Sequence, residues 1–483
     1  MLALLFILVA ASPEDLSVRL RHLAAAGSAA APAPSPDGAR VAFVTTLFGS
    51  RQAASLPADG GYPRQLTDEP GGVLSVRWTP DAKTVLAIAR RGERRRILAI
   101  DEESGAISEL DAAPGDQLLG GFARDGKRLF YAVIDGGKVT LKQMAIDSRR
   151  SVEVAPPPPA AGAPPSPLGS QSIADALAGL ASLGPPSPDG RSLVAQVRRG
   201  GDETLVLVDL ASARGEPLTP HQGKAHFRLP RFSNDGKTLY VLTDQGRSTL
   251  GIDAVDVAAR TRRPLYVPAR DVEAYGMSDD GHRLAVAVEQ EGESVFSLLE
   301  LPSLRAQPLP QPPGGALAQA VDGEPPLVWS RGGDRIFFSW GVSDDTTDVW
   351  LFRLGYGTPT RLTHSPRPGL VRDEIPRPKP LRIGDLHAWL WQPAETDHPR
   401  VVLLEGRHET RPVFDRRIAA LNFAGLAVLA VNAGTGSAPA AHEAALRYLA
   451  SAPDLDPAKP VTIDLDAQDD LPALVKSVRE KLK

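Results

Sequence analysis

A short turn sequence recurs along the first two thirds of the chain and constrains the fold more than any other feature. Its fullest form is Ser-Pro-Asp-Gly, and its copies begin at Ser35, Thr79, Ala123, Ser187, Ser233, Ser278 and Ser330. The intervals between copies are 44, 44, 64, 46, 45 and 52 residues, and a short apolar run follows each turn. Strand-rich repeats of this length are typical of a β-propeller with one four-stranded blade per repeat. The sequence therefore predicts a seven-bladed propeller over residues 35–372.

The 64-residue interval is the longest and predicts an insertion loop over residues 155–185. Its first part is rich in proline, which lacks the backbone donor that a strand ladder needs. The following segment, 173–183, is compatible with a short helix. Such a loop could cover the channel or bind a partner, and a disordered spacer is the simpler alternative.

The pattern of residues along the sequence changes near residue 373. Prolines mark a linker, and apolar strands then alternate with amphipathic helices, which predicts parallel βαβ units. We expect strands at 387–391, 401–404, 426–431 and 461–463 and helices at 413–423, 440–450 and 471–482. The predicted fold class is thus mainly β, a seven-bladed propeller followed by a small α/β domain over residues 373–483.

Charge and composition exclude several classes of function. The chain has 54 basic and 58 acidic residues among 483, so it lacks the excess positive charge typical of nucleic-acid binding. Its densest basic run, 90–96, is interpreted as a hairpin turn between strands. The sequence has no cysteine, which excludes disulfides, thiolate metal sites and a cysteine nucleophile.

The first 11 residues form an apolar run that is too short to cross a membrane and is typical of a signal peptide. We therefore expect export to the periplasm or beyond. The alternatives are a buried first helix or a misassigned start. Residues 12–34 are expected to form an N-terminal helix and a linker, and no later segment is apolar enough to span a membrane.

A propeller followed by an α/β domain resembles the prolyl oligopeptidase family of serine peptidases (family S9). The turns also resemble the repeats of TolB-like (PD40) propellers. Within the C-terminal region, 382–393 is similar to the strand that begins the family's hydrolase domain, and 401–407 to its strand and oxyanion segment. The stretch 456–463 is similar to the lead-in to its nucleophile strand. The resemblance implies an α/β-hydrolase domain built for a catalytic serine.

The residues that this chemistry needs are missing from the sequence. An α/β-hydrolase carries its nucleophile in Gly-x-Ser-x-Gly directly after that strand, because the strained turn needs flanking glycines. Here Asp466 stands at the nucleophile position, and Gly-x-Ser-x-Gly occurs nowhere in the chain. The family's His-Gly-Gly oxyanion segment is replaced by Glu405, Gly406 and Arg407, and a carboxylate there would oppose developing negative charge. No histidine follows Asp466. We therefore expect a truncated, degenerate hydrolase domain without catalytic residues.

Other candidate sites are weaker. Ser437 and His442 lack a nucleophile motif, and Ser437 is interpreted as a residue near a helix start. The acidic cluster of Asp464, Asp466, Asp469 and Asp470 is expected to favour the start of the last helix rather than to bind a metal. Asp344, Asp345 and Asp348 are expected in a hairpin turn. The scattered histidines, His221, His226 and His408 among them, lack zinc-ligand spacing.

These observations predict an exported, non-catalytic protein with no cofactor and no metal. It would bind a protein or peptide through the propeller rim, the insertion, the inter-domain cleft or the C-terminal domain. Two alternatives remain open: an active serine peptidase of the prolyl oligopeptidase type, and a TolB-like structural component of the cell envelope.

Overall fold

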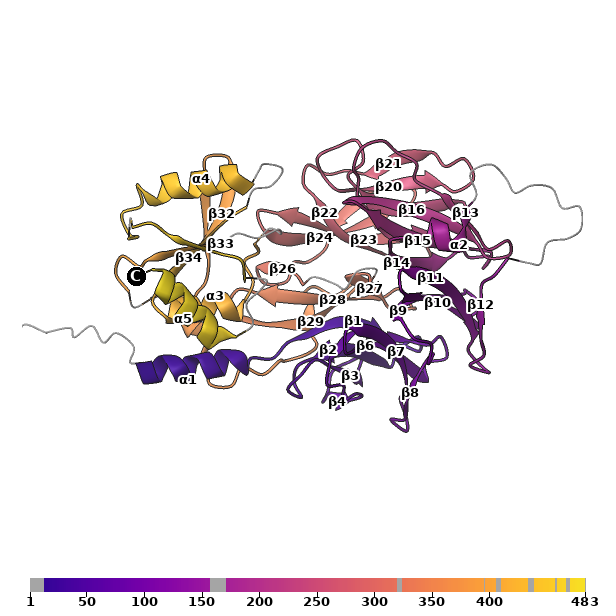
Figure 1. Ribbon diagram of the computed structural model, residues 1–483, viewed down its shortest axis with the longest axis horizontal. Helices are drawn as coiled ribbons and strands as arrows, with labels where there is room; N and C mark the ends of the chain where they lie inside the picture. Colours follow the sequence, from indigo (N-terminus) through magenta and orange to yellow (C-terminus); the bar gives the residue numbers. More distant parts are fainter. Residues whose placement is uncertain are drawn as a thin grey trace, which may run out of the picture.

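The computed structural model describes residues 13–156, 171–318, 324–394, 396–404, 410–432, 438–456, 458–465 and 470–482. The proposed signal peptide, 1–11, lies outside these residues. Most of the chain forms a β-propeller, and a smaller α/β domain lies beside it (Figure 1). Among the described residues, no helix combines the length and apolar composition that a membrane crossing requires.

Seven separate sheets form the propeller, and each is built from one continuous stretch of chain. Blades 1 to 3 comprise β1 (Ala29–Pro34), β2 (Arg40–Thr45), β3 (Gln52–Pro57) and β4 (Arg64–Gln65); β5 (Val73–Trp78), β6 (Thr84–Arg91), β7 (Arg94–Asp101) and β8 (Ile107–Glu109); and β9 (Asp116–Phe122), β10 (Arg128–Asp135), β11 (Lys138–Ala145) and β12 (Ser151–Glu153).

Blades 4 to 7 follow in the same way. They comprise β13 (Gln171–Ser172), β14 (Leu180–Pro186), β15 (Ser192–Arg199), β16 (Asp202–Asp209) and β17 (Arg214–Pro217); β18 (Phe227–Phe232), β19 (Thr238–Thr243), β20 (Gly251–Asp256) and β21 (Arg262–Tyr266); β22 (Val272–Met277), β23 (Arg283–Gln290), β24 (Glu293–Glu300) and β25 (Ala306–Pro308); and β26 (Gly315–Leu317), β27 (Leu327–Trp329), β28 (Arg335–Val342), β29 (Asp345–Arg353) and β30 (Thr360–Arg361). The predicted fold class and blade number are confirmed.

The recurring turn joins the innermost strand of a blade to the next strand, and its residues close it locally. In blade 1 the Ser35 hydroxyl accepts the Arg40 N–H at 2.9 Å, and the Asp37 carboxylate accepts the Ala39 N–H at 3.0 Å. Gly38 has φ +74°, a conformation that glycine adopts without strain. These bonds hold the pKa of Asp37 below its usual value, with the Ser35 hydroxyl as the main cause. The turn therefore forms from its own side chains, which is why the repeat is visible in the sequence.

The predicted insertion is shorter in the structure than in the sequence analysis. Within 155–185 lie β13, the short helix α2 (Ile173–Ala176) and most of β14, which is the innermost strand of blade 4. Gly179, with φ +84°, ends the helical turn, and the next residues pair with β15. The strand was missed because it is made of leucine and small residues, which lack the β-branched signal of an ordinary strand. Residues 157–170 lie outside the described part of the chain.

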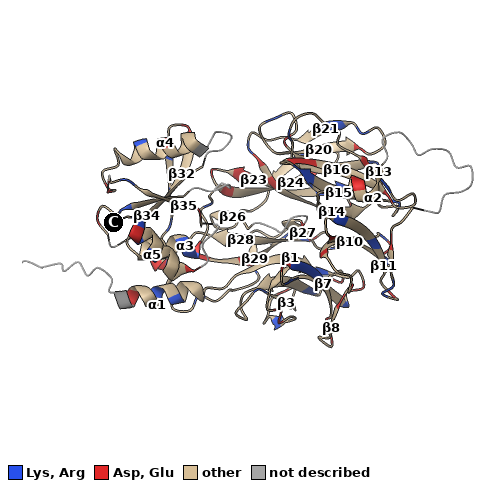
Figure 2. Ribbon diagram, viewed as in Figure 1, with Lys and Arg blue, Asp and Glu red and all other residues tan. Residues whose placement is uncertain are grey.

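The predicted basic hairpin is also present, formed by β6 and β7. Two of its arginines pair with acids: Arg91 lies 2.7 Å from Glu69, and the Arg95 Nε lies 3.0 Å from the nearer oxygen of Asp116. Figure 2 shows basic and acidic residues interspersed over both domains.

Apolar clusters fill the joints between neighbouring blades, including the joint between the first and last blades. There Val41 and Phe43 of blade 1 pack with Phe337 and Val349 of blade 7. Hydrogen bonds also cross this joint, from the Ala31 N–H to the Ser339 hydroxyl at 3.0 Å and from the Arg353 guanidinium to Asp59 at 2.9 Å. In the described residues no strand ladder runs between blades, so the ring is closed by side-chain packing.

The α/β domain contains a five-stranded sheet in the order β31-β32-β34-β33-β35. Its elements are the 3₁₀ turn η1 (Arg372–Glu374), β31 (Lys379–Ile383), β32 (Leu386–Trp391), β33 (Val401–Leu404), α3 (Arg416–Phe423), β34 (Ala427–Val431), α4 (Ala438–Leu449), β35 (Val461–Ile463) and α5 (Leu471–Lys481). The last three strands of the sheet, β34, β33 and β35, are parallel, as predicted.

The chain enters and leaves the propeller at the same place. The Gly27 N–H donates to the Pro366 carbonyl at 2.7 Å, so the two crossing segments lie side by side. Before this point α1 (Pro13–Ala24) packs its leucines against α3 and α5 of the α/β domain. The two ends of the propeller are therefore tied together and both reach the second domain (Figure 1).

Candidate functional site

The carboxyl ends of the parallel strands are where an open α/β sheet places its functional residues. Leu404 at the end of β33 pairs in register with Ile463 at the end of β35. The two predicted site segments follow these residues directly. Glu405, Gly406, Arg407 and Asp466 themselves lie outside the described residues, but the strands that lead into them end side by side.

Two contacts near this edge were not foreseen from the sequence. Asn432, just after β34, accepts the Thr410 N–H at 2.9 Å and donates to the Thr410 carbonyl at 3.1 Å. Arg417, in the first turn of α3, donates to the Leu465 carbonyl at 2.7 Å. Both side chains fix loops at the edge of the sheet. The signal that could have found Asn432 was a polar residue directly after a buried strand.

The other sequence candidates are placed as follows. Asp470 caps α5 by accepting the Ala473 N–H at 3.0 Å, as expected for an acid at a helix start. Ser437, His408 and Asp469 lie outside the described residues. His221 contacts Asp202 at 2.9 Å, and His226 contacts Asp244 at 2.6 Å. The described residues contain no group of three or more side chains arranged to hold a metal ion.

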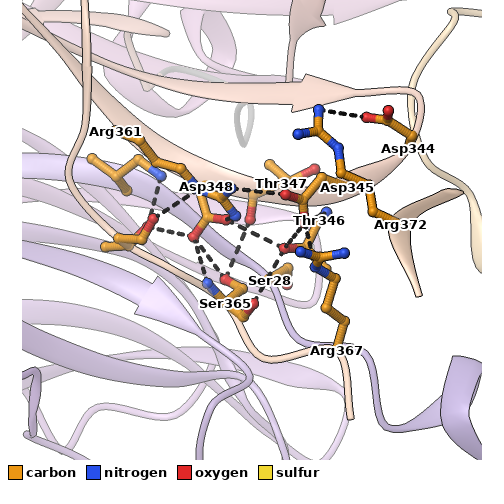
Figure 3. A network of polar contacts seen from close by, with 12 residues as sticks. Ser28, Asp344, Asp345, Thr346, Thr347, Asp348, Arg361, Ser365, Arg367 and Arg372 are labelled. Carbon is orange, nitrogen blue, oxygen red and sulfur yellow. Dashed lines mark hydrogen bonds and ion pairs between the residues drawn. The ribbon is translucent and has the colours of Figure 1, made fainter. Parts of the chain in front are cut away.

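Asp344 lies in the turn from β28 to β29, as predicted, whereas Asp345 and Asp348 belong to β29 itself, and all three are buried (Figure 3). Asp348 is 0% exposed and accepts hydrogen bonds from the hydroxyls of Thr363, at 2.6 Å, and Ser365, at 2.8 Å. Arg361 bridges Asp348 and Asp345, and it lies 2.8 Å from Asp345. We call this group of acids and their arginines the blade 7 network.

Arginines from the linker complete the blade 7 network. Arg367 lies 3.0 Å from Asp345, and Arg372 lies 2.9 Å from Asp344. Burial works to raise the pKa of Asp345, but the Arg361 contact and other partners outweigh it and hold that pKa below its usual value. The pKa of Asp348 is raised because burial outweighs its partners. The network anchors the linker to the last blade.

A second contact joins the α/β domain to blade 6, and we call it the blade 6 contact. Arg411 forms an ion pair with Glu273 of β22, and Arg382 lies 2.6 Å from Glu291 in the β23–β24 turn. Burial raises the pKa of Glu273 although Arg411 opposes it. In the same region, His387 Nδ1 and Trp389 Nε1 are buried with no hydrogen-bond partner. This junction is less completely paired than the blade 7 network.

The propeller encloses a channel lined by its innermost strands. A cavity of about 280 Å³ lies in this channel, between mostly small residues of β1, β5, β9 and β14. Three charged side chains line it: Arg77 of β5, Arg231 of β18 and Glu324 of blade 7. Glu324 belongs to the segment between β26 and β27, where the innermost strand of blade 7 is interrupted.

Solved structures of other proteins are similar to this chain over most of its length. Puromycin hydrolase is 16% identical, with a TM-score of 0.71, and the match covers 94% of this chain and 75% of that one. A puromycin-hydrolyzing peptidase of Mycobacterium tuberculosis is 18% identical with a TM-score of 0.69, covering 92% and 75%. A prolyl endopeptidase structure is 15% identical with a TM-score of 0.68, covering 91% and 68%. The chain has the fold of prolyl oligopeptidase-type serine peptidases.

Sequence comparison finds similarity over a smaller part of the chain than structure comparison does. No protein-family model matches the chain. A stretch of 97 residues is 35% identical to the uncharacterized peptidase YuxL of Bacillus subtilis (strain 168), and it covers 20% of this chain and 14% of that protein. The matched stretch is thus a small part of this relative's length.

Proposed function

We propose that this protein is an exported, non-catalytic relative of the S9 serine peptidases that binds peptides or unfolded protein segments. One observation carries the loss of catalysis. The sheet order and the strand–turn–helix formed by β35 and α5 provide the frame in which hydrolases of this fold hold a serine. In this chain the residues after β35 are Asp464, Leu465 and Asp466, and no flanking glycine accompanies them.

The binding role is supported by what remains of the fold. The propeller is complete, the α/β frame is folded against it, and the channel holds a cavity lined by charged and small side chains. Peptidases of this fold place a propeller beside the hydrolase domain. We infer that the propeller of this chain binds the ligand. Its degenerate hydrolase domain packs against the propeller without catalysing a reaction.

A serine-directed probe tests the absence of catalysis. The full chain is treated with a fluorophosphonate, with an active serine hydrolase in the same tube as a positive control, and both are analysed by intact mass. We expect no adduct on this chain. An adduct on one serine, removed by a single substitution such as Ser437→Ala, Ser451→Ala or Ser477→Ala, would establish the alternative of an active serine peptidase.

The names of the structural relatives favour that alternative, because they are peptidases and hydrolases. A TolB-like role in envelope assembly rests on the turn repeats, and co-purification with envelope complexes would support it over peptide binding.

A further inference from the structure

The recurring turn identifies one layer of side chains inside the channel, one from each blade. The position two residues before each recurring turn belongs to the innermost strand of its blade, and six of the seven copies line the channel cavity. The seven residues are Ala33, Arg77, Gly121, Pro185, Arg231, Gly276 and Val328. Five are small or apolar, so the two arginines set the charge of this layer.

The two arginines stand on blades 2 and 5, three blades apart, and so approach the cavity from different sides. Arg77 is paired: its guanidinium lies 2.8 Å from Glu324 and also donates to the Gly120 carbonyl. Arg231 donates to the neighbouring Pro230 carbonyl at 3.1 Å, and no described carboxylate forms an ion pair with it. Among the described residues, Glu324 therefore pairs with Arg77 and leaves Arg231 without a carboxylate partner.

Arg231 follows a bulge in β18, a feature that the innermost strand of blade 1 shares at Ala31. The strand has a register irregularity between Arg228 and Arg231, where Leu229 adopts φ +53°. The Tyr275 hydroxyl from blade 6 donates to the Leu229 carbonyl at 2.6 Å. Such a bulge redirects the side chains that follow it, and here a neighbouring blade supports it.

The guanidinium of Arg231 has few partners in the described part of the protein. Loss of water around the guanidinium lowers the pKa of Arg231, and the charge of Arg77 adds to this effect. An arginine nevertheless stays protonated at neutral pH, and Arg231 is partly exposed where it lines the cavity, so guanidinium donors beyond the bond to Pro230 are open to a ligand there. An anion in the cavity would satisfy these donors with charge-assisted hydrogen bonds.

We propose that the propeller channel contains a carboxylate-binding site in which Arg231 holds one carboxylate of a peptide ligand. Among the described lining residues, the two guanidinium charges and the carboxylate of Glu324 leave one net positive charge, which matches a monoanion. A cavity of about 280 Å³ accommodates a side chain or a chain end but not a folded domain. This inference rests on the proposed function for the peptide as ligand, while the anion site itself can be tested alone.

Three short probes distinguish the sources of the carboxylate. N-acetyl-triglycine carries it at the chain end, N-acetyl-Gly-Glu-Gly amide carries it on a side chain, and N-acetyl-triglycine amide carries none. Binding to the full chain is measured by calorimetry at low salt, because surface electrostatics weaken with ionic strength. We expect one or both carboxylate probes to bind at least ten times more tightly than the neutral amide.

Variants assign the binding to this site. Arg231→Gln is expected to weaken the carboxylate probes about ten- to hundredfold, the range for a charge-assisted hydrogen bond. The matched control is Arg228→Gln on the same strand, whose side chain is 48% exposed and whose loss should leave binding unchanged. Glu324→Gln removes the competing carboxylate and is expected to tighten binding, a gain that misfolding cannot produce.

Several results would overturn the proposal. These are equal binding of the amide probe, no effect of Arg231→Gln, or binding that emerges only in Asp322→Asn. The last result would mean that Asp322, outside the described residues, already occupies Arg231. Fluorophosphonate labelling together with Arg231-dependent binding would refute the proposed loss of catalysis and leave the carboxylate site standing.

Discussion

Two of the junctions between the propeller and the α/β domain with its linker use acids and arginines in different ways. In the blade 7 network the acids lie at the start of β29 and just before it, and their arginines, Arg361 to Arg372, follow in the same continuous segment of chain. In the blade 6 contact, Glu273 meets Arg411 across the two domains. The first junction has several cations for its acids, whereas the second leaves His387 and Trp389 without polar partners.

This difference teaches that burial alone does not make a polar junction strong. Ion pairs in a protein interior stabilise the fold only when their partners and remaining hydrogen bonds are supplied. The blade 7 network meets this condition and should behave as part of the propeller. The blade 6 contact meets it in part and should be the junction that opens first.

The largest effect is expected from Asp348→Ala. The substitution leaves Arg361 with one acid fewer and removes the acceptor of Thr363 and Ser365, so we expect a loss of about 4 kcal/mol in unfolding free energy. Urea unfolding measures it. The control is Asp373→Ala, whose side chain is 92% exposed and whose loss should cost less than about 0.5 kcal/mol. Similar midpoints for both variants would show that the network is not a stabilising anchor.

Arg411→Ala tests the blade 6 contact. It leaves the Glu273 carboxylate buried without its cation, and we expect a loss of about 3 kcal/mol, seen as faster hydrogen exchange in β22 and β32 with little change in blade 2. Arg382→Ala is the matched control, because its pair with Glu291 is more than half exposed and is worth under about 1 kcal/mol. Uniform acceleration in all blades would contradict a separable junction.

Gly292→Ala probes packing at the same junction. A Cβ atom there would lie 2.8 Å from the Trp389 indole nitrogen, and the backbone has φ +86°, so we expect a loss of about 2 kcal/mol. The corresponding turn of blade 2 contains Gly92, with φ +61° and no atom near its Cβ position. Gly92→Ala should therefore cost about 1 kcal/mol less, and equal losses would show that Trp389 does not restrict the turn.

The smallest effect is a difference in acid sensitivity between the junctions. The pKa of Glu273 is raised, so its contribution relative to Glu273→Gln is greatest below the usual glutamate pKa and declines as pH rises through the folded value. The pKa of Asp345 is lowered, so its contribution relative to Asp345→Asn is present above the usual aspartate pKa and is lost as pH falls through the folded value. Stability curves from about pH 3 to 7 should diverge in opposite senses, and parallel curves would contradict this assignment.

The sequence predicted those parts of the molecule whose chemistry is local. Most of the turns are closed by a serine or threonine and an aspartate of their own sequence, so the blade number could be read directly, and the alternation of strands and helices placed the α/β domain. The innermost strand β14 was missed because its small residues suit a channel wall rather than a typical strand. The blade 7 network was missed because Arg367 and Arg372 are recognised as partners only once the linker folds back over the turn.

The candidate site, like the blade 7 network, could be predicted from the sequence only in part. Asp466 and the segment from Glu405 to Arg407 were chosen by resemblance, and they lie outside the described residues. Arg231 was overlooked, although aligning the repeats would have shown it at the same offset as Arg77. What the alignment could not show is that Glu324 reaches only one of the two, because that depends on the interrupted strand of blade 7.

The way in which the ring closes bears on how such a protein can gain or lose a blade in evolution. Because every blade is a separate sheet and no strand ladder joins neighbouring blades in the described residues, a tandem duplication or deletion of about 45 residues would add or remove a whole blade without disrupting any other sheet. The number of blades can thus change by duplication or deletion of one repeat, and such a change would widen or narrow the central channel.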